Sequence, residues 1–188
     1  LLRLGSSPAR VMLARADGPA DNPTAAWADA VSGGAHGART GTPVLLTPSA
    51  TPHPAVMDWL ADHGAAPVLL GGTAALSDAH DELAGATRVE GPDRASTAIA
   101  VGERLWGVAS PFAAVTVIGG WDVDGWARGL AAAGLAADND APLVLVGDDV
   151  LPASTAAATR CATLFLVGGT DTISAGVEAS MREACPTQ

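Results

Sequence analysis

The 188-residue sequence lacks lysine and tyrosine, contains only two cysteines, and has an aromatic fraction of only 4%. Its ten basic residues are all arginines, and 20 acidic residues outnumber them, so the formal net charge is −10. Nucleic-acid binding requires a dense basic patch, which ten dispersed arginines do not supply. No apolar run approaches the roughly 18 residues that a membrane span needs. The sequence therefore predicts neither nucleic-acid binding nor a membrane span.

The two cysteines flank a predicted strand over 163–167 and a predicted helix over 174–183. Cys161 precedes the strand, and Cys185 follows the helix. A helix that returns antiparallel to its strand brings its carboxyl end back beside the start of the strand, so the two sulfurs can meet. A disulfide between them suits an oxidising compartment outside the cytoplasm. The alternative is that both cysteines are unpaired, small apolar side chains.

The clearest feature that the sequence does have is an internal repeat. The stretch GGTAALS at Gly71–Ser77 returns as GGTDTIS at Gly168–Ser174, 97 residues later, each time after an apolar run. Trp27 and Trp126 are 99 residues apart, and a proline that opens an apolar run recurs at the same spacing. Because three anchors agree within two residues, the chain contains two tandem units. Ser77 and Ser174 are expected to cap equivalent helices.

Each unit is predicted to alternate strands and helices in the order β-α-β-α-β-α. Continuous apolar runs without alternation are typical of parallel strands that are covered on both faces. With right-handed crossovers, the fold class is α/β, with one parallel sheet per unit and helices on both faces; a single continuous sheet is the alternative. The expected strands cover 11–15, 43–47, 66–70, 113–118, 142–146 and 163–167, and 87–90 is expected to be either a short strand or an extended connector. The expected helices cover 25–31 (capped by Thr24), 52–63, 77–84, 98–106, 126–136, 153–159 and 174–183, with a glycine-rich loop over 32–41 and the tail of another helix that ends at Gly5.

The segment 88–98, RVEGPDRASTA, resembles the opening of the type 2 cell-wall-binding repeat of Gram-positive surface proteins, which reads R-I/L-x-G-x-D-R-Y-x-T-A. The matching residues are Arg88, Gly91, Asp93, Arg94, Thr97 and Ala98. The stretch WADAV at 27–31 is similar to the F-A-D-A-L helix start of that family. The runs at 43–46 and 142–145 are similar to its P-I-L-L strand, and the two GGT turns to its last signature. The resemblance covers nearly the whole chain.

Three departures from the family pattern stand out. Ala95 stands where the family usually has Tyr, and Arg128 stands where the second unit should carry the equivalent of Asp29. The first unit lacks its opening motif. The first residue is Leu1 rather than methionine, and no signal segment follows it, so we expect part of a longer protein whose signal peptide or anchor lies outside the sequence.

The resemblance implies a Toprim-like α/β fold with a first repeat over 1–87, whose opening motif is missing, and a second over 88–188. It implies a secreted, extracellular, non-enzymatic module of the cell surface or cell wall, of the kind found in S-layer-type proteins. Such a module anchors a larger protein non-covalently to anionic polymers. The expected partners are an anionic cell-wall polysaccharide and further repeats or copies of the chain itself.

Five residues are candidates for polymer binding. Asp93 precedes a predicted helix, where a carboxylate caps free N–H groups, and Arg94 either pairs locally or binds a phosphate or carboxylate bidentately. A structural role is the stronger interpretation for both. Asp29 is interpreted as a local hydrogen-bond acceptor in the first turn of its helix, and Arg128 reverses the charge at the equivalent position. Trp121 lies in a loop and is expected either to stack on a sugar or partner, or to pack over its own helix.

The predicted strand ends, where α/β sheets bind ligands, carry mostly acidic residues: Asp17, Asp21, Thr47, Asp122, Asp124, Asp148, Asp149 and Asp171. Such an edge repels an anionic polymer. Either the polymer binds elsewhere, through arginine-bearing faces or grooves between units, or Ca²⁺ bridges acid to acid. The loop at 122–124 lacks the frame of a calcium site.

The histidines at 36, 53, 63 and 80 have no metal-ligand spacing and are expected at the surface or at helix caps. We therefore predict no metal and no cofactor.

The sequence is also compatible with two other functions. One is a structural surface protein that forms a lattice. The other is a divalent-ion-dependent α/β enzyme or small-molecule binder that uses the acidic strand-end loops. No nucleophile motif occurs in the sequence, so no catalytic residue is predicted.

Overall fold

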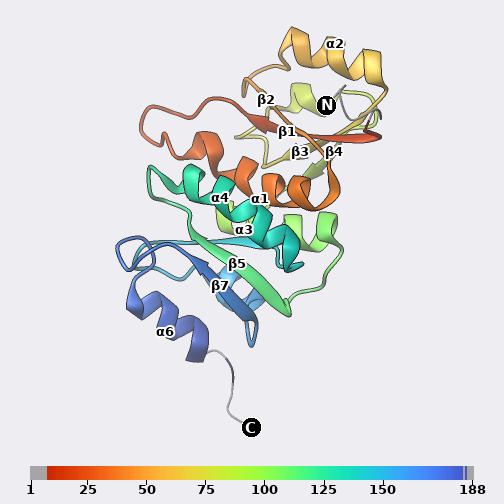
Figure 1. Cartoon of the computed structure of the whole chain (residues 1–188). Coiled ribbons are helices and arrows are strands. Elements are labelled where there is room, and N and C mark those ends of the chain that lie inside the picture. The colour runs from red at the N-terminus through yellow and green to blue at the C-terminus, as the bar shows by residue number, and fades with distance from the viewer. Residues whose placement is uncertain (1–7, 184, 186–188) are drawn as a thin grey trace.

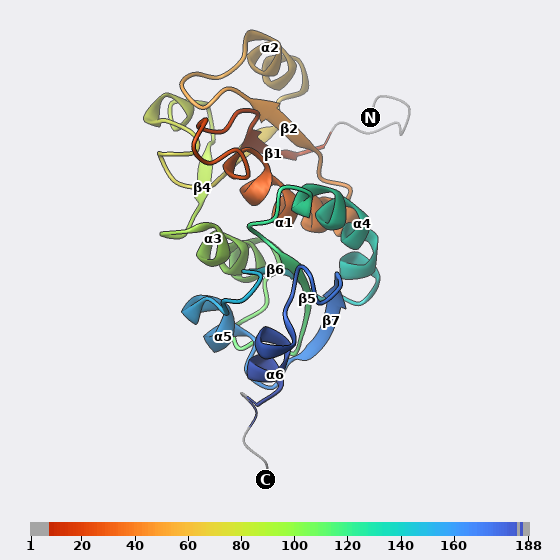
Figure 2. The same cartoon turned by 90° about the vertical axis from the view of Figure 1, so that its left-hand side faces the viewer.

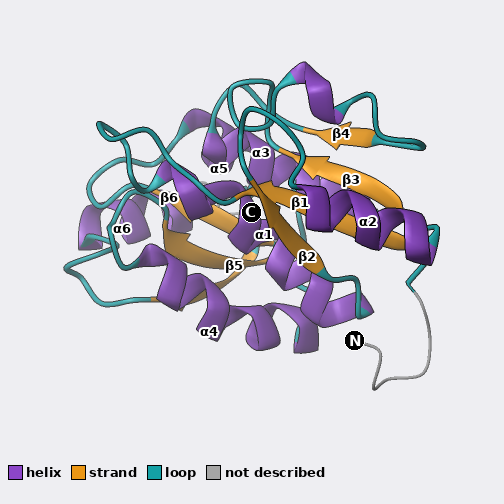
Figure 3. Ribbon diagram, turned by 90° about the horizontal axis from the view of Figure 1, so that it is seen from above, coloured by secondary structure: helices purple, strands orange, loops and turns teal. Residues whose placement is uncertain are grey.

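The chain forms two separate parallel sheets, one after the other along the sequence. The computed structural model describes residues 8–183 and 185, so the expected helix end at Gly5 lies outside the described residues. The first sheet contains β1 (Arg10–Arg15), β2 (Val44–Thr47), β3 (Ala66–Leu70) and β4 (Thr87–Val89), in the order β2-β1-β3-β4. Figure 3 shows these four strands side by side. The second sheet contains β5 (Ala114–Gly119), β6 (Leu143–Val146) and β7 (Thr163–Val167), in the order β6-β5-β7.

The helices form three layers around these sheets (Figures 1 and 2). Between the sheets lie α1 (Ala25–Thr40), α3 (Arg94–Val101), which continues as the π-helical segment η3 (Gly102–Trp106), and α4 (Gly125–Asp138). The outer face of the first sheet is covered by α2 (Pro54–His63), and that of the second by α5 (Ala153–Ala158) and α6 (Ala175–Glu183). The predicted α/β class with two parallel sheets and helices on both faces is confirmed.

The alternation of side chains along each strand explains this layering. In β1, Met12 belongs to the central core between the sheets, and Leu13 belongs to the outer core under α2. In β6, Leu145 faces the central core and Val144 the outer core under α5 and α6. Every strand of both sheets pairs in parallel with its neighbours. Strands that are buried on both faces need the continuous apolar runs that the sequence shows.

The predicted end of the first helix at Val31 is wrong, because α1 continues through the glycine-rich segment to Thr40. A Cβ at Gly33 would overlap Leu70 of β3, and one at Gly37 would lie 2.6 Å from the Thr42 carbonyl oxygen. These glycines therefore allow α1 to approach the first sheet closely. The hydroxyl of Thr24 makes no capping hydrogen bond to α1, although Thr24 stands at the cap position.

The predicted helix over 77–84 is also wrong, because only the short 3-10 helix η2 (Asp78–His80) forms there. Arg88 of β4 donates hydrogen bonds to the carbonyl oxygens of Gly71 and Ser77 and to the carboxylate of Asp81. These tertiary bonds hold the segment in an irregular path that local helix propensity alone would not favour. Ser77 stands at the cap position of η2, but its hydroxyl donates to the Ala50 carbonyl and makes no capping hydrogen bond.

The equivalent turn in the second unit does lead into a regular helix. Ser174 accepts a hydrogen bond from the N–H of Val177 and so caps α6. The helix predicted over 98–106 begins four residues earlier than expected, because α3 already begins at Arg94. The other predicted strands and helices agree with the structure to within two residues at each end.

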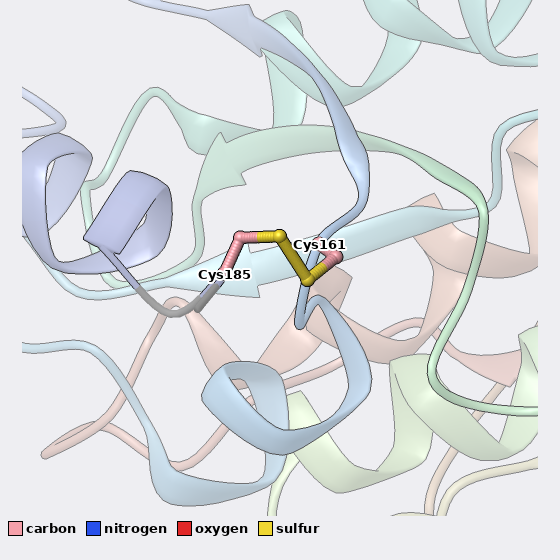
Figure 4. Close-up of a disulfide and its surroundings, with 2 residues drawn as sticks. All are labelled: Cys161 and Cys185. Carbon is pink, nitrogen blue, oxygen red and sulfur yellow. A yellow bond between two sulfur atoms is a disulfide. The ribbon is translucent and has the colours of Figure 1, made fainter. Parts of the chain in front are cut away.

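A disulfide joins Cys161, just before β7, to Cys185, after α6, with the Cα atoms 4.6 Å apart (Figure 4). It closes the last strand–helix unit of the chain. In the described part of the chain, no helix combines the length and the apolar character that crossing a membrane requires.

Candidate functional site

A cavity of about 510 Å³ opens where the carboxyl ends of the first sheet meet the start of the second unit. Ligands of parallel α/β sheets bind at such strand ends. The wall is formed by the end of β1, the loop into α1, the turn after β3, the segment after β4, and the loop after β5. Its residues are Arg15, Asn22, Ala25, Ala28, Asp29, Gly72, Thr73, Ala74, Ala75, Glu90, Gly91, Pro92, Asp93, Arg94, Thr97 and Trp121.

Asp93 fixes the start of α3 at the edge of this cavity. Its carboxylate accepts a hydrogen bond of 2.7 Å from the N–H of Ser96, as an N-cap does. Thr97 of the same helix accepts a hydrogen bond from the N–H of Gly91, which holds the preceding turn against the helix. The first residue of α3 is therefore Arg94, and its side chain enters the cavity from a rigid helix end.

Arg94 joins the second unit to the first. Its Nη1 donates to the hydroxyl of Thr24 at 2.9 Å and to the carbonyl of Gly120, and its Nη2 donates to Asn22 at 3.2 Å. The guanidinium also lies 5.0 Å from the centre of the Trp121 ring, in cation–π geometry. Burial lowers the pKa of Arg94, and the nearby carboxylate of Asp29 opposes that effect. The guanidinium stays charged at neutral pH, because its ordinary pKa is so high.

Asp29 is a buried carboxyl, only 8% exposed, on the cavity side of α1. Burial raises its pKa, while Arg15, Arg94 and a hydrogen bond with Thr97 act in the opposite direction. Its expected role as an acceptor in the first turn of its own helix is wrong, because these partners come from β1 and α3. Gly71 has φ +94° and faces the Asp29 carboxylate so closely that a Cβ there would overlap it. Gly71, the first glycine of the repeated turn, thus makes room for this carboxyl.

Arg15 is the second cation of the cavity, and no sequence motif marks it. It ends β1, and its Nε donates to the Ala25 carbonyl at 2.7 Å. Among the described residues, no acceptor binds its Nη2 group within the chain. Glu90, directly after β4, is an exposed carboxylate in the same wall. In the sequence, the one signal for both residues is their position at the carboxyl ends of the predicted strands over 11–15 and 87–90.

Arg128 does not reach the cavity, whereas Arg94, Asp93, Asp29 and Trp121 all line it. Arg128 forms a salt bridge with Asp122 at the start of α4. The backbone N–H of Asp124, together with Arg128, lowers the pKa of Asp122. Trp121 is 42% exposed and turns to the cavity and to Arg94.

The strand-end edge is less uniformly acidic than its sequence suggested, because Arg15 and Arg94 converge on it. Within residues 8–183 and 185, no three His, Cys, Asp or Glu side chains come together in a way that suits a metal ion. His53 caps α2, as expected, and His63, in the last turn of the same helix, is half-buried and forms a hydrogen bond with the Trp59 carbonyl. His36 and His80 are buried rather than at the surface.

Comparisons with known proteins agree with this architecture. A family described as cell wall binding domain 2 (CWB2) matches residues 8–81 and 88–178. Among solved structures, the chain is similar to Cwp8 from Clostridium difficile, with a TM-score of 0.72 and 20% identity over 96% of this chain. It is also similar to Cwp6 from Clostridium difficile, with a TM-score of 0.75 and 14% identity over 95% of this chain. At this level of identity, the two structures show a shared fold.

The chain spans only 30% of the Cwp8 chain and 28% of the Cwp6 chain. A comparison with curated proteins gives no match. The family match covers both units and most of the chain. The chain therefore belongs to the cell wall binding domain 2 family and is a wall-binding module of the cell surface.

Proposed function

We propose that this module anchors a larger protein, non-covalently and without catalysis, to an anionic polymer of the cell wall. The cavity between the units binds a phosphate or carboxylate group of that polymer. The observation that carries the proposal is the convergence of Arg15 and Arg94 on one cavity at the strand ends. Guanidinium groups bind phosphate and carboxylate with strong, charge-assisted hydrogen bonds.

The two arginines have different roles in this proposal. Arg94 is held by three acceptors and fixes the shape of the cavity. Arg15 has a free Nη2 group among the described residues and is the direct ligand of the anion. Two of the carboxylates in the wall interact with groups of the chain itself. Asp29 is buried beside both arginines, and Asp93 caps α3. Their repulsion of an anion is therefore weakened.

We also propose that the units, 1–87 and 88–188, act as one binding body. β4, from the start of the second unit, pairs with β3 of the first. Arg94 of α3 bonds to the loop before α1, about 70 residues earlier in the chain. Neither unit alone would form the complete wall of the cavity, so isolated units are expected to lose binding.

Sedimentation of the protein with purified cell-wall material tests the proposal. Arg15→Ala is expected to weaken binding roughly tenfold or more, because a hydrogen bond to a charged group contributes about 1.5–3 kcal/mol. The matched control is Arg182→Ala, which removes an equal charge from α6; among the described residues, Arg182 pairs only with Glu178. Binding should also disappear when the anionic polymer is stripped from the wall. Equal binding by Arg15→Ala and the wild type would contradict the assignment of the cavity.

A further inference from the structure

A second cavity, of about 420 Å³, lies beside the first and shares two residues with it. It lies at the carboxyl ends of β5 and β6 and is lined by Asp93, Trp121, Gly147, Asp148, Val150 and Pro152. Asp93 and Trp121 belong to both walls. The two cavities therefore adjoin at a single aromatic side chain.

The two cavities differ in charge. Arg15 and Arg94 line the first, whereas none of the described residues that line the second is basic. The wall of the second combines two carboxylates, Asp93 and Asp148, with the apolar surfaces of Trp121 and Val150, of which Val150 is 65% exposed. Among the described residues, no hydrogen bond engages the side chain of Asp148. A phosphate or carboxylate would be repelled here, whereas hydroxyl groups would find acceptors.

We propose that this second cavity binds an uncharged sugar unit of the wall polymer, adjacent to the anionic group that the first cavity holds. A pyranose ring has an apolar C–H face, which packs on an aromatic side chain, and a rim of hydroxyl donors, which suits Asp93 and Asp148. This inference rests on the proposed function for the identity of the polymer. It adds that the polymer presents a neutral sugar next to each anionic group that is recognised.

Hydrogen bonds within the chain hold the loops of the second cavity in place. The turn that carries Asp148 is closed by a hydrogen bond of 2.9 Å from the Gly147 N–H to the Val150 carbonyl. The carbonyl of Asp148 accepts a further bond of 2.8 Å from the N–H of Ser174. Trp121 is held from one side by Arg94. A preorganised site binds with a smaller loss of conformational entropy, so even one sugar unit can contribute to affinity.

Nuclear magnetic resonance titration of the 188-residue chain separates the two cavities. The probes are inorganic phosphate, the neutral sugars glucose and N-acetylglucosamine, and their 1-phosphates. At least one neutral sugar should shift the Trp121 indole N–H and the amides of 147–150. Phosphate should shift the signals of Arg15 and of 72–75. The matching sugar 1-phosphate should bind at least about tenfold more tightly than either part, since two linked contacts act together.

Two neighbouring substitutions give a matched test. Asp148→Ala should weaken neutral-sugar binding about tenfold and leave phosphate binding unchanged. Asp149→Ala, which removes an equal charge outside the cavity wall, should change neither. The proposal is overturned if no neutral sugar shifts these signals, if Asp148→Ala and Asp149→Ala behave alike, or if phosphate binds at 147–150. If the sugar binds as expected but phosphate shifts nothing near Arg15, the anion site fails and the sugar site stands.

Discussion

The two units of this chain share one framework and differ in what covers their edge strands. By strand register, Leu46 of β2 and Leu145 of β6 hold equivalent positions. Leu145 is fully buried in the central core with residues of α3, whereas Leu46 is 56% exposed. α3 opens the second unit, and within residues 8–183 no helix takes that place beside β2. The comparison shows that the opening helix of a unit buries the edge strand of that unit.

The opening motif of the second unit also serves the first. Its Arg88 bonds to the turn after β3, β4 extends the first sheet, and Arg94 holds the loop before α1. In the second unit, by contrast, β7 has no further strand beside it among the described residues, and the disulfide closes the end of the unit. The opening motif of the second unit therefore connects the two units.

The charges at equivalent positions differ in the same way. Arg15 at the end of β1 corresponds in register to Gly119 at the end of β5, and Asp29 of α1 corresponds to Arg128 of α4. Asp29 faces Arg15 and Arg94 in the cavity, whereas Arg128 pairs with Asp122. Among its described residues, the second unit therefore carries no copy of the arginine-lined cavity. Four experiments test this comparison.

The largest difference is expected between two leucine substitutions. Leu145→Ala should lower the free energy of unfolding by about 2–5 kcal/mol, because it leaves a hole in the central core. Leu46→Ala, at the equivalent but exposed position, should change it by less than about 0.5 kcal/mol. Urea denaturation of both variants measures the difference. Equal losses would show that Leu46 is also buried in solution, by a contact that the chain described here does not make.

Removal of the disulfide should destabilise the second unit in particular. Replacing both Cys161 and Cys185 with Ala releases a loop of 24 residues and should cost about 3 kcal/mol. Amide hydrogen exchange should then accelerate more in β5–β7 than in β1–β3. Treatment of the wild type with a reductant should reproduce the effect. An unchanged stability would mean that the bridge does not form in solution.

Arg94 should contribute more than Arg128 to the free energy of unfolding. Arg94→Ala should cost about 2–3 kcal/mol, since it removes bonds from a charged group to three acceptors and weakens the joint between the units. Arg128→Ala should cost less than about 1 kcal/mol, because its single salt bridge with Asp122 is partly exposed. Arg94→Lys keeps the charge but cannot span the acceptors, so it should resemble Arg94→Ala. If Arg94→Lys were as stable as the wild type, the charge alone would account for the role of Arg94.

The smallest effect concerns the pH dependence of stability at Asp29. Because burial raises its pKa in the folded state, ionised Asp29 opposes folding at neutral pH, and this penalty disappears as the pH falls through the raised pKa. Asp29→Asn cannot ionise. The stability of the wild type relative to Asp29→Asn should therefore increase as the pH is lowered from 7 to about 4. Denaturation at several pH values measures this difference, and a decrease on acidification would show that the pKa is lowered instead.

The sequence predicted the sheets well because buried parallel strands need continuous apolar runs, as at 66–70 and 163–167. The sequence-based prediction failed at α1. Gly33 and Gly37 are residues typical of a loop, but here they allow the helix to pack closely against β3 and Thr42. It also failed at 77–84, where bonds from Arg88 override the helical pattern.

The candidate site was only partly predictable. The motif marked Asp93, Arg94 and Asp29, and the low aromatic content marked Trp121. Arg15 carries no motif, and its meeting with Arg94 depends on how α3 packs against the first unit. In the sequence, Asp148 is one of several acidic residues at predicted strand ends, and its cavity forms between loops that are far apart in sequence. Local patterns cannot show such convergence.

In the proposed function, the arginine-lined cavity between the units holds the anionic group of the wall polymer. The most direct test is to map the binding of polymer fragments, released from purified walls, onto the resonances of the chain. The largest shifts should fall at Arg15, at 72–75 and at 90–94, and Arg15→Ala should weaken the binding of the fragments about tenfold or more. Shifts confined to another surface, such as α2 or α6, would contradict it.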